Sequence, residues 1–375
     1  MAEPGLTSAG FRNVLLQRAE DSGWALCIGA GTSQGALPNW KSLVEKLIKK
    51  ERGLRLKAAS LKRLWTKLTP EALVQASKNR LLIGDESFAE LLSHVLYADL
   101  KKAVGDDSWK TCAHALSAVS PGQLNNQRKW EDYLKIIAKI SAGGSALSLA
   151  EVVYKASSRD RKQKSIASQP VLSIAPAAIL SFNAEPLLFS LINAQAGSDS
   201  RWRVPLGAKR LLDRVNRGIS YRSPNRIPYI FLHGLLPIPD ALPQFERVLS
   251  AEKLVFSEGE YLAMANTSFS WASSMFLSNA VLRTMVFVGL SFTDQNLRRW
   301  LAWVHDNKRT ELEQQVRLKG RQVTPEHGHY WINRRPKTPE EESWIESSVE
   351  HLGVRLVWIN EWREAGYCLG GALGL

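Results

Sequence analysis

Short apolar runs that end in glycine or polar residues constrain this sequence most. The clearest are WALCIGAG at 24–31 and TMVFVGLS at 284–291, and PAAILSFN at 176–183 and RIPYIFLHG at 226–234 have the same form. Each is long enough for one buried strand, and its terminal glycines or polar residues fit a tight turn into the next segment. Continuous apolar strands of this kind are typical of parallel sheets that are covered on both faces.

Segments with helical spacing of apolar residues alternate with these strands. These predicted helices span 11–24, 37–50, 185–197, 294–306 and 340–353. Further strands are expected at 252–257, 328–333 and 354–360. Residues 198–226 form a polar, proline-rich connection. Strands that alternate with helices predict an α/β fold, with a doubly wound, mostly parallel, Rossmann-like sheet.

The stretch from 51 to 168 has a different texture, because helical periodicity continues through it with almost no strand signal. We therefore expect a helical subdomain at 51–168, inserted into a core made of residues 1–50 and 169–375. A chain of 375 residues has room for this arrangement, and 45% hydrophobic residues can form a sizeable core.

Composition argues against several classes of protein. No apolar run approaches the roughly 20 residues that cross a bilayer, and the N-terminus lacks the features of a secretory signal, so we expect a cytoplasmic protein without a membrane partner. The chain has only three cysteines, Cys27, Cys112 and Cys368. A disulfide framework and a four-thiolate zinc site are excluded by that number, and we expect no metal.

The formal net charge of +13 leaves two interpretations open. A basic surface can bind a polyanion such as nucleic acid. The basic residues are scattered through several segments, however, which fits a solvated basic surface equally well.

The first feature at a strand end is GAGTSQG, which spans Gly29, Ala30, Gly31, Thr32, Ser33, Gln34 and Gly35. Glycines allow a close backbone approach to a phosphate, and a following helix offers N–H groups. The motif is not a full G-x-G-x-x-G, so an ordinary strand-to-helix turn is the alternative. In open α/β sheets, ligands bind at this carboxyl edge.

Polar side chains at two other strand ends are candidates for chemistry. Asn183 in SFNAE can hold a water or a ribose hydroxyl, although Asn or Ser there can also cap the next helix. His233 in LHG can act as a base near neutral pH, although a lone histidine is more often structural.

Two later features complete the set of strand-end loops. FSEGEY, which ends at Tyr261, is expected either to border a pocket or to start a helix that Ser257 caps. In GLSFTDQN, from Gly289 to Asn296, Ser291 can accept an adenosine ribose or a phosphate. Helix capping by Thr293 or Asp294 is the alternative for the rest of this loop.

The order and spacing of these features resemble the sirtuin-like fold, and especially the bacterial sirtuin-like NAD+ hydrolases of anti-phage defence. The resemblance covers residues 24–48 and about 176–360. It implies that the chain binds NAD+ as its substrate and cleaves the nicotinamide–ribose bond.

The resemblance also implies a role for each matched residue. Gly29, Ala30, Gly31 and Ser33, with Thr32 in the same loop, would hold the pyrophosphate, and Asn183 would orient the water or ribose. His233 would be the general base. The adenosine end would be bordered by Gly289, Ser291, Asp294 and Asn296. Glu185 stands where the family has Asp, whose side chain is one methylene shorter. This departure leaves two alternatives to full activity open: reduced activity, and activity only after assembly.

The resemblance further implies control by assembly, because no sensor segment is evident in the sequence. A homo-oligomer is expected, and the implied partner is a hexameric HerA-type DNA-translocase ATPase or another nucleic-acid-linked sensor. Three alternatives stay open: a scaffold that only binds NAD or ADP-ribose, a basic nucleic-acid-binding protein, and a protein deacylase. Deacylases of the family use a zinc module, and the missing cysteines favour water as the acceptor.

Overall fold

The protein is an α/β fold built on a seven-stranded parallel sheet in the order β3-β4-β2-β1-β5-β6-β7. The computed structural model describes residues 8–50, 57–117, 140, 143–166, 174–198, 211–215, 226–241, 254–266, 270–319 and 328–375. The strands are β1 (Trp24–Ile28), β2 (Ala178–Ser181), β3 (Leu212–Val215), β4 (Ile227–Phe231), β5 (Thr284–Val288), β6 (His329–Arg334) and β7 (Val354–Ile359). The predicted fold class, a doubly wound parallel sheet, is confirmed.

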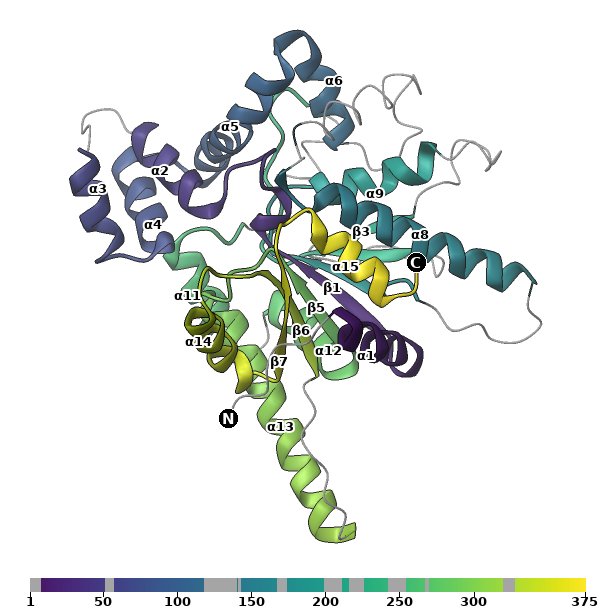
Figure 1. The fold of residues 1–375 in the computed structure, drawn as a ribbon. Helices are drawn as coiled ribbons and strands as arrows, with labels where there is room; N and C mark the ends of the chain where they lie inside the picture. Colours follow the sequence, from purple (N-terminus) through teal and green to yellow (C-terminus); the bar gives the residue numbers. More distant parts are fainter. Residues whose placement is uncertain are drawn as a thin grey trace.

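Helices cover both faces of the sheet (Figure 1). One apolar cluster joins the sheet to α1 (Ser8–Asp21), α8 (Ala146–Ile166), α9 (Leu187–Ser198) and α15 (Glu364–Ala372). A second cluster joins the other face to α12 (Trp271–Leu282), α13 (Gln295–Lys319) and α14 (Pro339–Glu350). The far end of α13 projects beyond the sheet.

Side-chain alternation in the central strands explains why there are two clusters. Leu26 and Ile28 of β1 belong to the first cluster, whereas Ala25 and Cys27 belong to the second. All residues of β1 and β5 are buried. Neighbouring side chains of a strand point to opposite faces, so a strand that is covered on both faces is apolar at every position.

Five of the helices that the structure describes between β1 and β2 gather at one end of the sheet (Figure 1). They are α2 (Trp40–Lys50), α3 (Ala58–Trp65), α4 (Pro70–Leu81), α5 (Asp85–Val104) and α6 (Asp106–Ser117). A later helix, α11 (Glu258–Asn266), contacts α4, where Lys78 donates to Glu260 at 3.2 Å. By contrast, α8 packs against α9 and α15. The helical character of the inserted region agrees with the sequence, and its proposed domain boundaries stay a prediction.

The strand order creates a crevice next to β1. After β1 the chain forms β2 beside it, β3 at the edge of the sheet and β4 between β2 and β3, and then crosses to the other side of β1 to form β5, β6 and β7. Helices that leave β1 and β5 therefore lie on opposite faces, and a gap opens at the carboxyl ends of these two strands. The predicted loops after β1, β2, β4 and β5 all end at this edge.

Three elements differ from the sequence-based expectation. The polar connection at 198–226 contains β3, a short edge strand in which buried Asp213 pairs with Arg226 at 3.0 Å. The strand expected at 252–257 is wrong for its described part, because Val255 N–H donates to His233 O at 3.0 Å, in a loop beyond the end of β4. Helix α15 was not predicted. Part of the region predicted to be helical at 51–168, including 118–139, lies outside the described residues.

Candidate active site

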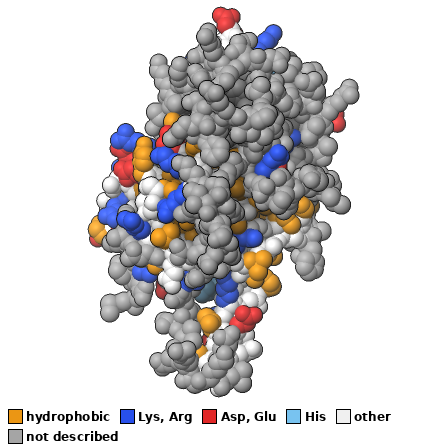
Figure 2. Space-filling model, turned by 90° about the vertical axis from the view of Figure 1, so that its right-hand side faces the viewer, with side chains coloured by type: hydrophobic (Ala, Val, Ile, Leu, Met, Phe, Trp, Pro, Cys, Tyr) orange, Lys and Arg blue, Asp and Glu red, His pale blue; other side chains and the backbone are white. Residues whose placement is uncertain are grey.

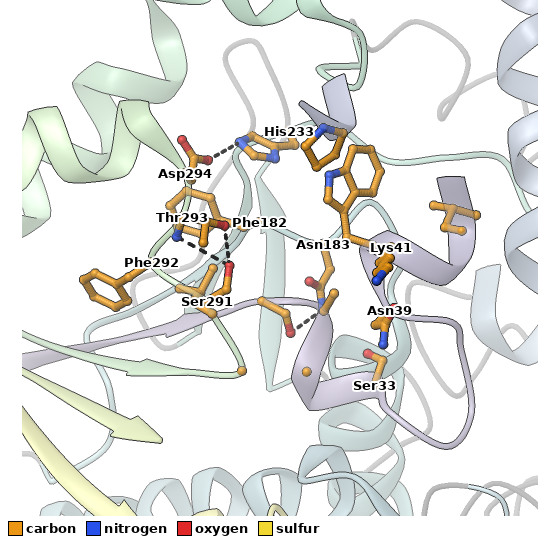
Figure 3. A pocket seen from close by; sticks show the side chains of 18 of the residues that line it. Ser33, Asn39, Lys41, Phe182, Asn183, His233, Ser291, Phe292, Thr293 and Asp294 are labelled. Atoms are coloured by element: carbon orange, nitrogen blue, oxygen red, sulfur yellow. Dashed lines mark hydrogen bonds and ion pairs between the residues drawn. The ribbon is translucent and has the colours of Figure 1, made fainter. Parts of the chain in front are cut away.

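A cavity of about 870 Å³ occupies the crevice at the carboxyl edge of the sheet. That volume lies within the ~300–1,000 Å³ range of pockets that bind small molecules and cofactors. Figure 3 shows that its side chains come from loops far apart in the sequence. The lining includes most of the predicted site residues: Gly29, Ala30, Gly31, Ser33, Asn183, Glu185, His233, Gly289, Ser291 and Asp294.

The two glycine turns that form the floor pack directly against each other. Gly29 N–H donates to Val288 O at 3.0 Å, and Gly31 N–H donates to Gly289 O at 2.9 Å. A Cβ on Gly29 would lie 2.6 Å from Gly289 O, and Gly289 has a φ of +70°. These glycines are therefore needed for contact between the turns, and the amides of Gly29 and Gly31 are already used by the protein. The glycines allow a ligand to approach the backbone closely, but the N–H groups of Gly29 and Gly31 are not available to bind it.

A 3-10 turn, η1 (Ala30–Ser33), follows β1 directly, and the helix predicted at 37–50 is present as α2, which begins at Trp40. Thr32 is fully buried and does not line the cavity. Its Oγ1 donates to Gly29 O at 2.8 Å and accepts a hydrogen bond from Asn183 Nδ2 at 3.3 Å. Thr32 thus helps to orient the Asn183 amide from outside the cavity lining.

Asn183 is oriented by hydrogen bonds on one side of its amide group. Its Nδ2 donates to Gly29 O at 3.1 Å and to Glu185 Oε1 at 3.0 Å. Ser181 Oγ accepts the Asn183 backbone N–H at 3.1 Å and so fixes the loop. The side-chain oxygen of Asn183 is buried and has no hydrogen-bond partner in the structure. An oriented acceptor is therefore left over at the cavity wall.

Glu185 lines the cavity, yet both of its carboxylate oxygens are engaged by the protein. Oε1 accepts hydrogen bonds from Ser33 Oγ at 2.5 Å and from Asn183, and Oε2 accepts the Leu187 N–H at 2.5 Å at the start of α9. Burial raises the pKa of the Glu185 carboxyl, and these hydrogen bonds oppose that shift. The longer Glu side chain thus ties the β1 turn to the β2 loop.

His233 sits at the end of β4 with only 7% of its surface exposed. Its ring packs edge-on against Phe182 at 5.2 Å and against Tyr261 at 5.5 Å between centroids. Burial lowers the pKa of His233, while the charge of Asp294 and a hydrogen bond with the Phe182 backbone raise it. Its Nε2 is buried without a hydrogen-bond partner in the structure. A neutral imidazole with a free nitrogen can accept a proton.

Asp294 lies beside His233, and Figure 3 shows the two side chains facing each other. Its Oδ2 is 4.0 Å from His233 Nε2 and accepts a hydrogen bond from the Tyr261 hydroxyl at 3.1 Å. Its Oδ1 accepts the Asn296 N–H at 2.8 Å and caps α13. Asp294 is therefore a helix cap and a cavity residue at once. We call Phe182, His233, Tyr261 and Asp294 the His233 cluster.

The rest of the β5–α13 loop divides into lining and supporting residues. Ser291 is exposed at the cavity and shares a hydrogen bond with Thr293 at 2.7 Å. Asn296 is buried and does not line the cavity. Its Oδ1 accepts a hydrogen bond from Arg299 at 3.0 Å. The geometry therefore gives Asn296 a supporting position in α13.

Much of the cavity wall was not found from the sequence. The missed residues share no motif and come from helices, from β6 and from the turn after β7: Trp40, Lys41, Pro70, Glu71, Leu96, Arg298, Trp331, Asn333, Ile345, Ser348 and Trp362. Only Trp40 and Lys41 had a usable signal, because they follow the glycine turn and Pro38 directly. Sequence position alone does not reveal that α4 and α5 reach the same cavity.

Residues 209–352 match a SIR2-like domain. This stretch includes His233, Gly289, Ser291, Asp294 and Asn296, and it suggests an NAD-related activity. The fold agrees with a sirtuin-like Rossmann arrangement. Gly29 to Ser33, Asn183 and Glu185 lie outside the matched stretch, and the tertiary structure brings most of them to the same cavity. A comparison with curated proteins finds no match.

Further features of the part of the chain that the structure describes bear on metal, membrane and polyanion binding. There, no group of three His, Cys, Asp or Glu residues is arranged to hold a metal ion, and no helix is long and apolar enough to cross a membrane. His329 is buried, and its Nδ1 accepts the Met285 N–H at 3.2 Å, while His327 lies outside the described residues. On the face shown in Figure 2, Lys and Arg side chains are scattered among acidic and apolar ones.

Proposed function

We propose that this chain is an NAD+ glycohydrolase that uses water to cleave the nicotinamide–ribose bond. One observation carries the proposal: Asn183 Oδ1 and His233 Nε2 are buried, lack hydrogen-bond partners, and belong to residues that line one cavity. Unpaired buried polar atoms are costly in a folded protein, so a group that pairs with them on binding explains their presence. The SIR2-like match supports a nicotinamide dinucleotide as the molecule that brings those groups.

The residues present can divide the reaction between them. Nicotinamide leaves as a neutral base and takes the electron pair of the C–N bond, so positive charge develops on the ribose. Asn183 Oδ1 would accept a hydrogen bond from the attacking water or a ribose hydroxyl and fix its position. His233 would take the proton that water loses as its oxygen bonds to the ribose carbon. The products are nicotinamide, ADP-ribose and a proton.

Charge around the cavity suits a dinucleotide in one orientation. Asp294 and Glu71 both line the cavity, and, besides burial, the charges of both raise the pKa of the Tyr261 hydroxyl. Carboxylates stabilise a nearby cation, so the pyridinium and the developing ribosyl cation fit best beside the His233 cluster. Lys41 lines the cavity as well, and its ammonium is suited to the pyrophosphate.

Incubation of the purified chain with NAD+, alone and with the product of a neighbouring gene, tests this function directly. We expect nicotinamide and ADP-ribose to accumulate together in equal amounts, as chromatography can measure. ADP-ribose binding without nicotinamide release would instead indicate a scaffold. Removal of an acyl group from an acyl-lysine peptide in the same assay would indicate a deacylase. Strongly salt-dependent DNA binding without NAD+ cleavage would indicate a nucleic-acid-binding protein.

We further propose that the chain depletes NAD+ as a regulated effector of anti-phage defence in the cytoplasm. The proposal rests on the resemblance to the sirtuin-like hydrolases of defence systems. Such an activity must be silent before infection, and a homo-oligomer or a nucleic-acid-linked ATPase partner would supply the switch. Sedimentation and NAD+ turnover, measured with and without the product of a neighbouring gene, test this control. Full activity in an isolated monomer would contradict it.

A further inference from the structure

The side chain of Asp294 connects a helix cap to the imidazole of His233. Its Oδ1 accepts the N–H groups of Asn296 at 2.8 Å and Leu297 at 3.2 Å, at the first turn of α13. These bonds fix the carboxylate, and the Tyr261 hydroxyl donates to Oδ2 at 3.1 Å. Oδ2 is then held 4.0 Å from His233 Nε2.

This distance has a chemical consequence for His233. It is too long for a direct hydrogen bond, and a neutral Nε2 carries a lone pair that gains nothing from a carboxylate. A protonated Nε2 carries an N–H and a positive charge, and both are attracted to Oδ2. The pair therefore interacts favourably only after His233 has accepted a proton.

We propose that Asp294 is a positioning residue that stabilises the protonated form of His233 during catalysis, with Tyr261 holding its carboxylate. The inference rests on the proposed NAD+ hydrolysis, in which His233 takes the proton of the attacking water. Asp294 is thereby assigned to the reacting end of the cavity and not to the adenosine end that the sequence resemblance implies.

The groups around His233 allow a clear expectation for pH dependence. Asp294 faces the ring from the start of α13, Tyr261 from α11, and Phe182 from the β2 loop. Glu71 of α4 acts on Tyr261 through its charge, whereas Glu260 is paired with Lys78. Burial lowers the pKa of His233, and the Asp294 charge raises it. Loss of that charge should lower the pKa further.

The Asp294→Asn variant separates charge from capping, because an Asn oxygen caps a helix as well as an Asp oxygen does. We expect nicotinamide release to fall at least about 10-fold at its optimum. We also expect the acid limb of the pH–rate profile to move to lower pH, because His233 would then stay neutral to lower pH. Tyr261→Phe should give a smaller change in the same direction. Asp306→Asn, on the exposed part of α13, is the matched control and should change neither quantity.

A histidine NMR titration tests the coupling without any need for turnover. The His233 signal, assigned by its loss in His233→Gln, should titrate at lower pH in Asp294→Asn than in the unsubstituted protein. If the unsubstituted chain releases no nicotinamide, either alone or with the product of the neighbouring gene, the hydrolase proposal fails, while this titration still decides whether Asp294 acts on His233. Asp294→Ser also supplies a cap without charge and replaces Asp294→Asn if that variant does not fold. An unchanged His233 titration in a folded variant would overturn the inference.

Discussion

The two sides of the cavity differ in whether their polar atoms have hydrogen-bond partners within the protein. On the α13–α14 side, Arg298 donates to Phe292 O and Ser348 O, and Trp331 Nε1 donates to Leu290 O at 3.1 Å. Around the His233 cluster, His233 Nε2 and Asn183 Oδ1 have no hydrogen-bond partner in the structure. Arg298 and Trp331 are thus paired within the protein without a ligand, whereas these two atoms are not. The difference indicates where the reacting atoms of a substrate would lie.

Glu185 shows that lining the cavity is not sufficient for a role in chemistry. It stands next to Asn183 in the same loop, but both of its oxygens accept hydrogen bonds from the protein. Each oxygen of Glu185 already has a donor within the protein, so neither depends on a substrate for a hydrogen-bond partner. We therefore place Glu185 with the supporting residues, and the variants below test this division.

The largest effect should come from His233→Ala. Loss of the general base should lower nicotinamide release by about 10²–10⁴-fold at neutral pH while the protein stays folded. A coupled assay for nicotinamide, with circular dichroism as the check on folding, measures both. Turnover at the unsubstituted rate in the folded variant would remove His233 from the reaction.

The same variant should change how stability depends on pH. The folded-state pKa of His233 is lowered from its ordinary value of about 6.5, so the folded protein disfavours its protonation. The contribution of His233 to stability is therefore present above pH 6.5 and is lost as pH falls through the lowered pKa. The free energy of unfolding should decline less on acidification in His233→Ala than in the unsubstituted protein. A denaturant titration at several pH values measures this, and parallel declines would contradict it.

Asn183→Ala should have the next largest effect, with a loss of about 100-fold in nicotinamide release. The fold should survive, because Gly29 O still accepts the Thr32 N–H and hydroxyl, and Glu185 Oε1 still accepts the Ser33 hydroxyl.

Asn193→Ala is the matched control for that variant. Asn193 Oδ1 accepts the N–H groups of Leu211 and Leu212 and lies outside the cavity lining. Its removal should lower the free energy of unfolding and leave the turnover of the folded protein unchanged. If Asn193→Ala and Asn183→Ala lose turnover to the same extent, the side-chain oxygen of Asn183 has no special role.

Glu185→Gln should mainly reduce stability. An amide in this position cannot accept from Ser33, Asn183 and the Leu187 N–H together, because one of its two ends donates. The unmet bond should lower the free energy of unfolding by about 1–3 kcal/mol in urea denaturation. Glu361→Gln, at an exposed ion pair with Arg363, should stay within about 0.5 kcal/mol. Equal stability of Glu185→Gln and the unsubstituted protein would show that the buried bonds are not needed.

The smallest effect should come from Lys41→Gln. Lys41 is exposed at the cavity, where its ammonium lies 5.6 Å from the Trp65 ring centroid. Water screens an exposed charge, so we expect KM for NAD+ to rise only about 2–5-fold, with kcat unchanged. Lys46→Gln, on the same helix and paired with Asp99, should leave KM unchanged. An unchanged KM in Lys41→Gln would show that Lys41 does not contact the substrate.

The strands and their terminal loops were predictable because burial on two faces leaves a strong local signal. The runs before Gly29, Asn183, His233 and Gly289 each form a strand of the sheet. The edge strand β3 was missed because its four residues include Asp213 and Arg214, so the apolar signal is weak. Helix capping by Asp294 was one of the two alternatives read from the sequence, and the structure shows that the cap and the cavity position coexist.

The sequence by itself determined the type of fold and the polar and glycine residues of the strand-end loops, because strand periodicity and turn residues act locally. Only the tertiary structure decided which polar atoms remain unpaired, since Glu185 meets Ser33 across 152 positions of chain and Asp294 meets Tyr261 across 33. Hydrogen bonding between distant segments depends on their packing in space, and a linear sequence carries no direct record of that packing.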